Sequence, residues 1–481
     1  MLDLSRRQFL RSTVASGAAL LAAGTIERRR VWAVDAPGAQ TPLPTKTPSK
    51  IRVERKRHGF EDAAGKPFVP FGVTYYRPGT GWAPQLWKQF DAEATRRDFA
   101  RLKRQGTNVV RVFISFGSFF TDPGKLNPEG LAKFDQLLSL ADEAGLYVHP
   151  TGPDAWEGMP AWTKDLNVFS NDTNGACLAA LENYWRLFAA RYRGRSTIWA
   201  YDLRNEPHVA WDTPYLRSQW AAWRKAHNQD LVPVPDPKMN PPVPELADYQ
   251  RFRESIAQKW VARQSKAIHA ADPDALVTVG LLQWSVPAQR IAIDQYTGFR
   301  PSVIARHLDF LELHFYPLVV GVYDYGGPAA ETANLAVLEA MARECAKPGL
   351  PLVIAEFGWY GGGPLAPHGK PATEEQQSQW CRHLLEVTSP MACGWLNWGM
   401  YDHPQAMDVS KLTGLFTADG KEKAWGRTFR DLAERFRANP PAYALPNRPD
   451  LPWAACTASG DAMEKFRQAY LATFAARWES Q

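Results

Sequence analysis

The sequence has few of the features that mark metal-binding, disulfide-rich or membrane-spanning proteins. Its 481 residues include only five cysteines, which are scattered and form no CxxC pair, and it contains no HExxH motif. These absences exclude the common zinc-binding patterns, and an odd cysteine count leaves at least one thiol unpaired. The export signal described below implies folding before export, which suits a protein not built on disulfides, so we expect one disulfide bond at most. The apolar stretch at residues 14–24 is too short and too rich in alanine and glycine for a stable membrane span.

The chain also lacks a large net charge once its first residues are set aside. The formal charge is +6, but residues 1–33 contain six arginines and two acidic residues, so the remainder carries about +2. The basic balance therefore gives no support to nucleic-acid binding, and we expect no nucleic-acid partner.

The first 33 residues have the pattern of an export signal. Residues 5–11, Ser-Arg-Arg-Gln-Phe-Leu-Arg, resemble a twin-arginine motif, the apolar stretch follows, and residues 31–33 offer a cleavage site. We therefore predict a signal peptide at residues 1–33, a flexible linker at 34–50, and a periplasmic or secreted protein that meets the twin-arginine export machinery. The alternative is a basic N-terminus that is not cleaved. No cysteine follows the apolar stretch, so we expect no membrane anchor.

Short apolar runs alternate with amphipathic stretches from about residue 51 to 437, which is typical of a parallel α/β sheet. The expected strands are 68–76, 109–116, 146–151, 198–205, 275–282, 308–316, 352–357 and 394–400. Eight such repeats predict a (β/α)₈ TIM barrel with active-face loop insertions in a domain of residues 51–437. The longest insertion, at 211–244, follows the fourth strand and is expected to cover the active face. Residues 438–481 are expected to form a short C-terminal extension packed on the barrel.

Two glutamates follow apolar runs at the ends of predicted strands. Glu206 lies in Asp-Leu-Arg-Asn-Glu-Pro at residues 202–207, and Glu356 lies in Ile-Ala-Glu-Phe-Gly at 354–358. In an α/β barrel, catalytic groups sit at the C-terminal ends of the strands. Two carboxyl groups that face each other there are what the hydrolysis of a glycosidic bond requires.

Over residues 55 to 430 the chain resembles the retaining glycoside hydrolases of clan A, within them family 5, the cellulases, mannanases and their relatives. The resemblance implies that Glu206 is the general acid/base, that Asn205 binds the sugar 2-hydroxyl, and that Glu356 is the nucleophile.

The same resemblance assigns roles in the substrate site to four further residues on three other strands. It implies that Arg111 lies beside the nucleophile, that Tyr316 bonds it, and that Trp398 forms the floor of the sugar subsite. It implies that His314 contacts substrate. Because sugar rings pack on aromatic planes, Trp284 and Trp359, on loops of the active face, are the other favoured substrate contacts.

The third strand departs from the family pattern. Family members often carry a histidine at its C-terminal end, whereas His149 comes about four residues too early, so we expect it to be a core residue. Asp154, Trp156 and Glu157 follow on the active-face loop and are candidates to replace the function of that histidine.

Together these features predict retaining hydrolysis of β-glycosidic bonds in a polysaccharide or oligosaccharide of β-mannan or β-glucan type, with no cofactor or metal. The alternative from another class is a non-catalytic carbohydrate-binding barrel, which would be expected to lose one of the two glutamates. An inverting hydrolase would hold its carboxyl groups farther apart, at about 6.5–9.5 Å.

Overall fold

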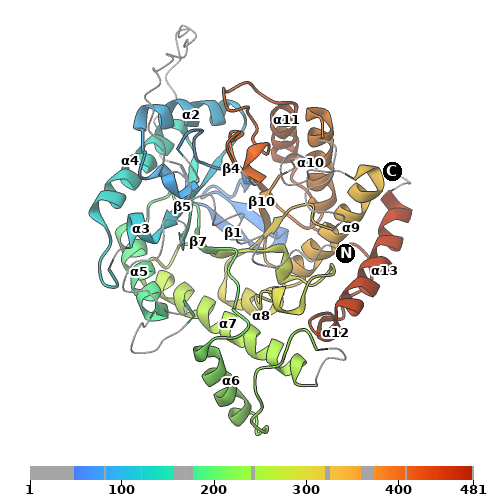
Figure 1. The fold of residues 1–481 in the computed structure, drawn as a ribbon. Coiled ribbons are helices and arrows are strands. Elements are labelled where there is room, and N and C mark those ends of the chain that lie inside the picture. The colour runs from blue at the N-terminus through green and yellow to red at the C-terminus, as the bar shows by residue number, and fades with distance from the viewer. Residues whose placement is uncertain are drawn as a thin grey trace, which may run out of the picture.

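In the computed structural model, eight parallel strands close into a barrel surrounded by helices (Figure 1). The structure describes residues 48–80, 83–120, 122–154, 168–169, 177–239, 244–319, 326–358, 372–406 and 409–478. The barrel strands are β4 (Phe71–Thr74), β5 (Val109–Ser115), β6 (Tyr147–Asp154), β7 (Tyr201–Asn205), β8 (Val277–Leu281), β9 (Leu311–Phe315), β10 (Leu352–Phe357) and β11 (Gly394–Asn397). They pair in chain order, and β11 closes the ring onto β4. The predicted (β/α)₈ barrel is confirmed, and each of its strands overlaps a predicted one.

Several of the helices begin and end at recognisable sequence signals. The helices are α2 (Ala92–Arg104), α3 (Phe116–Phe119), α4 (Pro128–Ala144), α5 (Cys177–Arg191), α6 (Pro214–Ala226), α7 (Glu245–Ala271), α8 (Pro301–Ile304), α9 (Gly327–Ala346), α10 (Glu374–Thr388), α11 (Ala424–Ala438), α12 (Trp453–Cys456) and α13 (Gly460–Trp478). In α4, the Asn127 side chain accepts the Glu129 N–H, Pro128 opens the first turn, and Gly145 ends the helix in the left-handed region at φ 64°.

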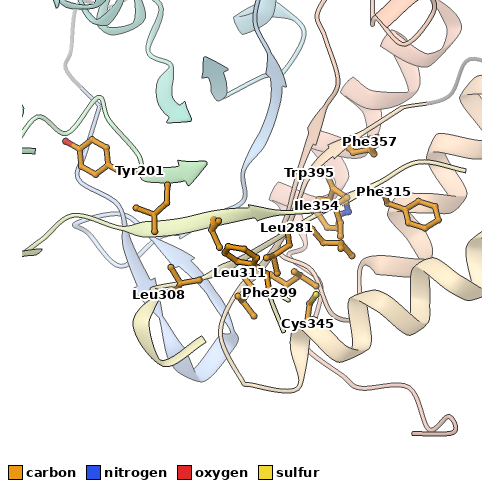
Figure 2. Close-up of a cluster of buried hydrophobic side chains, with 14 of the residues drawn as sticks. Tyr201, Leu281, Phe299, Leu308, Leu311, Phe315, Cys345, Ile354, Phe357 and Trp395 are labelled. Carbon is orange, nitrogen blue, oxygen red and sulfur yellow. The ribbon is translucent and has the colours of Figure 1, made fainter. Parts of the chain in front are cut away.

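The strands present alternate side chains to the helices and to the barrel interior. On β9, Leu311, Leu313 and Phe315 belong to the large apolar cluster between sheet and helices, part of which appears in Figure 2. Glu312 and His314 lie between them in sequence and are fully buried. Because successive residues of a strand point to opposite faces, these two polar side chains lie inside the barrel.

A small antiparallel sheet that the sequence did not predict covers the opposite end of the barrel from the candidate site. It consists of β1 (Arg52–Glu54), β2 (Gly59–Glu61) and β3 (Pro67–Phe68). Phe60 packs edge-on against Trp199 and Phe310, with ring centroids 5.3 and 5.2 Å apart. Trp199 and Phe310 lie just before β7 and β9, where these barrel strands begin. The small sheet therefore covers the N-terminal end of the barrel. Strands of two or three residues are too short to show an alternating pattern.

The long insertion lies differently from the prediction. Its helix α6 packs beside α7 at the periphery, beyond the ring of helices, and not over the strand ends (Figure 1). The Trp220 ring meets Tyr249 of α7 edge-on at 5.1 Å. An amphipathic helix with tryptophans on one face is stabilised by burying that face on a neighbouring helix. Residues 240–243 of this insertion lie outside the described part of the chain.

The C-terminal segment contacts the barrel helix α9. Glu339 of α9 accepts hydrogen bonds from the Tyr470 hydroxyl at 3.1 Å and from Nε of Arg448 at 2.7 Å. All five cysteines lie in the described residues and all are free. No helix in the described ranges is both long and apolar enough to cross a membrane. The predicted signal peptide, and the linker up to residue 47, lie outside the described residues.

Candidate active site

Irregular strand pairing aims both candidate carboxylates into the barrel mouth. On β10 the register with β9 shifts between Ile354 and Glu356, and on β7 the register with β8 shifts between Asp202 and Asn205. Such bulges re-aim a side chain relative to the regular alternation of a strand. The residue that follows β7, Glu206, has φ 46°. This left-handed backbone costs a non-glycine residue roughly 1–2 kcal/mol and must be held by its surroundings.

The two glutamates meet at one histidine ring. Nδ1 of His314 lies 3.1 Å from Oε1 of Glu206 and 3.4 Å from Oε2 of Glu356. One side-chain atom from each of these residues falls within 4.8 Å of the other two. The structure therefore brings together three of the residues that the sequence predicted for the site.

Arg111 connects three side chains of the site by hydrogen bonds. Its Nη1 donates to Oε2 of Glu356 at 3.0 Å, and its Nη2 donates to Oδ1 of Asn205 at 2.7 Å and to Oδ2 of Asp202 at 3.3 Å. The guanidinium lies 4.8 Å over the Phe113 ring and is fully buried. A buried cation is stable only with such partners, and the planar fork fixes several groups at once.

Burial shifts the pKa values of Glu206, Glu356 and His314 away from those of free side chains. Burial raises the pKa of Glu206 to about 7, with the Arg111 charge opposing the rise. Burial also raises the pKa of Glu356, while His314, Arg111 and the Tyr316 hydroxyl act to lower it. Burial lowers the pKa of His314 to about 4. The ring is therefore uncharged at neutral pH, and its Nδ1 lies within hydrogen-bonding reach of Glu206 and Glu356.

Tyr316 and Trp398 flank the Glu356 carboxylate and its strand. The Tyr316 hydroxyl donates to Oε1 of Glu356 at 2.9 Å, opposite the oxygen that the arginine binds. Trp398 follows β11, and its backbone N–H donates to the Phe357 carbonyl at 2.8 Å. Its indole N–H donates to the Ser410 hydroxyl at 3.1 Å, which fixes the ring plane.

Of the two remaining predicted aromatic contacts, the structure describes Trp284 but not Trp359. Trp284 is half-buried in the 3₁₀ turn Gln283–Ser285 after β8. The structure links this turn to the site through its neighbour Gln283, whose side-chain oxygen accepts the Tyr316 N–H at 2.9 Å. Trp359 lies outside the described residues, as do Trp156 and Glu157.

Two buried acids were missed by the sequence reasoning. Asp202 pairs with Arg111, and Oε1 of Glu312 lies 2.7 Å from Nε2 of His149. The expectation that His149 is a core residue agrees with its full burial, and its Nδ1 lies 2.9 Å from the Ala200 carbonyl oxygen. The signal was available, because Glu312 shares a strand face with His314, two residues along.

The carboxylates and imidazoles of the site also form two groups with metal-like donor sets. One contains His149, Asp202 and Glu312, and the other contains Glu206, His314 and Glu356. In each group one carboxylate already bonds the Arg111 guanidinium. A divalent cation would have to approach this fixed positive charge, so we assign no metal to either group. The arrangement is instead suited to proton transfer and nucleophilic attack.

Comparison with known proteins identifies the family of the chain and several relatives. Residues 62–404 match the family model described as cellulase, glycosyl hydrolase family 5. Mannan endo-1,4-beta-mannosidase F of Aspergillus clavatus is 22% identical over 62% of this chain and 64% of its own length. Mannan endo-1,4-beta-mannosidase A of Podospora anserina is 22% identical over 62% and 73%. The chain thus spans less than two thirds of the first of these relatives.

Solved structures share the fold. A GH5_18 variant from Streptomyces cattleya in complex with Manβ1-4GlcNAc superposes with a TM-score of 0.60 at 21% identity, over 83% of this chain and 91% of that one. The exo-β-1,4-mannosidase from Opitutaceae bacterium strain TAV5 has a TM-score of 0.59 at 21% identity, over 79% and 62%. At such identities the likeness supports the barrel architecture.

Proposed function

The chain belongs to the cellulase family, glycosyl hydrolase family 5, and from this premise we propose that it hydrolyses β-mannosidic bonds by double displacement. Glu356 is the proposed nucleophile and Glu206 the proposed acid/base. The observation that carries the proposal is the convergence of both carboxyl groups on Nδ1 of His314, at 3.1 and 3.4 Å.

The close approach of these groups favours retention of configuration. Retaining enzymes hold their two carboxyl groups about 5–5.5 Å apart, while inverting enzymes need about 6.5–9.5 Å to admit a water molecule. The side-chain atoms that Glu206 and Glu356 present to each other fall within 4.8 Å. This close approach of one oxygen from each group agrees with the retaining spacing rather than the inverting one.

In the first step, Glu356 attacks the anomeric carbon while Glu206 gives its proton to the leaving oxygen. A carboxyl group with a pKa of about 7 is protonated over the acidic and neutral range, as a general acid must be. Arg111 and the Tyr316 hydroxyl bond the two oxygens of Glu356 and favour its ionised form. In the second step, Glu206 takes a proton from water, which attacks the glycosyl-enzyme at the same carbon.

The other site residues are proposed to bind the sugar. The Asn205 side chain, held by Arg111, is placed to bond a 2-hydroxyl, and Trp398 to face the sugar ring. His314 contacts both carboxyl groups. Trp284 and Trp359 remain candidates for more distant subsites.

A β-mannan or a short β-linked manno-oligosaccharide is the proposed substrate. The relatives that match by sequence are named as endo-acting mannan hydrolases, and one structural neighbour is named as an exo-acting mannosidase. A β-glucan is the second candidate, since the catalytic carboxyl pair itself does not distinguish the two sugars.

The decisive experiment measures sugar release and covalent trapping together. Wild type and Glu356→Ala are incubated with soluble β-mannan, mannobiose, β-glucan and xylan, and wild type is also incubated with a 2-deoxy-2-fluoro-β-mannosyl fluoride. Release by wild type alone, with a fluoromannosyl group on Glu356 by peptide mass analysis, is expected. Hydrolysis that gives the inverted anomer by NMR would contradict double displacement. Binding without release would favour the carbohydrate-binding barrel.

We also propose that the chain is exported by the twin-arginine route and acts in the periplasm or outside the cell. The support is the motif at residues 5–11 and the apolar stretch that follows it. Replacing Arg6→Lys and Arg7→Lys together should leave the protein in the cytoplasm, which fractionation and immunoblotting would detect. Unchanged export would contradict this route.

A further inference from the structure

The backbone that carries the proposed acid/base is held by a side chain from the neighbouring strand. Asp154, the last residue of β6, accepts the Asn205 N–H on Oδ2 at 3.2 Å. On the far side, the Glu206 N–H donates to the Gly280 carbonyl of β8 at 2.9 Å. The two peptide groups on either side of Asn205, the second of which leads into the left-handed Glu206, are thus fixed from two different strands.

Asp154 is built into this place rather than resting on the surface. Its residue is only 5% exposed, and its second oxygen, Oδ1, lies 3.7 Å from Nε of Arg204. Burial raises the pKa of this carboxyl to about 6, opposed by Arg204 and by the Asn205 N–H. When one carboxyl oxygen is protonated, the other still accepts a hydrogen bond, so the contact with Asn205 survives a change of charge.

Asn205 is consequently held at both ends. Arg111 bonds its side-chain oxygen at 2.7 Å, while Asp154 bonds its backbone N–H. Without the bond to Asp154, the peptide that precedes Asn205 could rotate, and the displacement would pass through Asn205 to the Glu206 carboxyl group. A shift of about 1 Å in a catalytic group is enough to cost a large factor in rate.

We propose that Asp154 is a positioning residue for the acid/base: its Oδ2 fixes the Asn205 amide and so the direction in which the Glu206 carboxyl points. It stands where the third strand lacks the histidine that its family often carries, and it acts through the backbone of the fourth strand. This role rests on the proposed function of Glu206 and goes beyond it, because it adds a residue on a different strand.

Leaving-group dependence separates this role from a merely structural one. The dinitrophenolate of a 2,4-dinitrophenyl β-mannoside leaves without being protonated, whereas the leaving sugar of mannobiose requires a proton from the general acid. Asp154→Ala should lower kcat/KM on mannobiose by about tenfold or more, within the range that general acids supply. On the dinitrophenyl substrate the loss should stay within about threefold, because the nucleophile is untouched.

The conservative variant tests the geometry against the charge. Asp154→Asn keeps an oxygen that can accept the Asn205 N–H, so its ratio of kcat/KM values on the two substrates should return to near that of wild type. Should Asp154→Ala not fold, Asp154→Ser serves the same comparison, because its hydroxyl is too short to reach the amide. Thermal unfolding is measured for each variant.

Asp309 supplies a matched control. Its carboxylate also accepts a backbone N–H at the start of a barrel strand, that of Val277 at 2.8 Å, but at the end of the barrel away from the site. Asp309→Ala should lower stability and leave the ratio of the two substrates unchanged.

The role of Asp154 is overturned if Asp154→Ala slows both substrates by the same factor, or if Asp154→Asn is no better than Asp154→Ala on mannobiose. A wild-type enzyme that cleaves neither mannoside would instead contradict the proposed function, so the two failures are distinguishable.

Discussion

Nη1 of Arg111 lies 3.0 Å from Oε2 of Glu356, and both side chains are almost completely withdrawn from water, at 0% and 6% exposure. In such a setting the pair is not the weak ion pair of a protein surface. Burial raises the pKa of Glu356, and the guanidinium opposes this rise by favouring the ionised form that a nucleophile requires.

Replacing Arg111→Lys should therefore impair the nucleophile more than the fold. A lysine ammonium cannot bond Glu356, Asp202 and Asn205 at once, so kcat/KM should fall by about 100-fold. Weaker stabilisation of the charged form raises the pKa of Glu356, and the acidic limb of the kcat/KM profile should move to higher pH. Steady-state rates on an aryl β-mannoside between pH 4 and 9 measure both effects. An unmoved acidic limb would contradict the assignment.

The pKa of about 7 at Glu206 predicts where activity is lost on the alkaline side. The general acid works only when protonated, so kcat/KM on mannobiose should fall as the pH rises through about 7. Glu206→Ala should lower this activity by about 10²–10⁴ and remove the alkaline limb from the pH profile of the residual activity on mannobiose. An alkaline limb that persists in this variant must belong to another group, and would reject Glu206 as the acid.

The same pKa predicts that Glu206 destabilises the folded protein above acidic pH. Its pKa is raised from 4.5 in the free side chain to about 7 in the fold. The folded state binds the proton of Glu206 more tightly than the unfolded state does. The stabilisation that this proton provides is therefore fully present below pH 4.5 and is lost as the pH rises through about 7. Glu206→Gln has no charge to bury and should be more stable than wild type at pH 8, by on the order of 2–3 kcal/mol, and equal to it at pH 4.

Urea unfolding at the two pH values measures this difference without any substrate. A surface glutamate such as Glu129, changed to Gln, provides the control and should show no such gain, because its pKa is not raised. Equal stability of Glu206→Gln and wild type at pH 8 would show that the ionised Glu206 does not destabilise the folded protein, and would contradict the raised pKa.

The barrel and its central pair could be predicted because each rests on local sequence. Strand β10 was predicted to its exact ends by a continuous apolar run closed by Glu356, and the family motif around Glu206 lies on one strand. The sheet β1–β3 could not be predicted, because strands of two or three residues are too short to show an alternating pattern of apolar and polar residues. The position of α6 could not be predicted either. The order of elements along the chain tells which strand end the insertion follows, but not which helix the apolar face of α6 will contact.

The buried charges inside the barrel were the least predictable part of the site. Nothing local to Glu312 reveals that its partner is His149, which is 163 residues away in the chain. Pairing of this kind depends on the closure of the barrel, which brings β6 and β9 to face each other across the interior. A charged residue in an apolar strand predicts a partner, but only the fold identifies it.

That pair yields the last prediction, which concerns stability. Both ring nitrogens of His149 face oxygen acceptors, the Ala200 carbonyl and the Glu312 carboxyl, so removing either partner leaves a buried polar group unsatisfied. His149→Leu and Glu312→Leu should each lower the free energy of unfolding by about 3–5 kcal/mol. The double variant His149→Leu/Glu312→Leu removes both polar groups and should lose much less than the sum of the two, since an apolar pair can replace a buried ion pair at little cost. Urea unfolding of all four proteins gives the coupling free energy. Additive losses would show that the two side chains are stabilised independently of each other, despite the 2.7 Å between them.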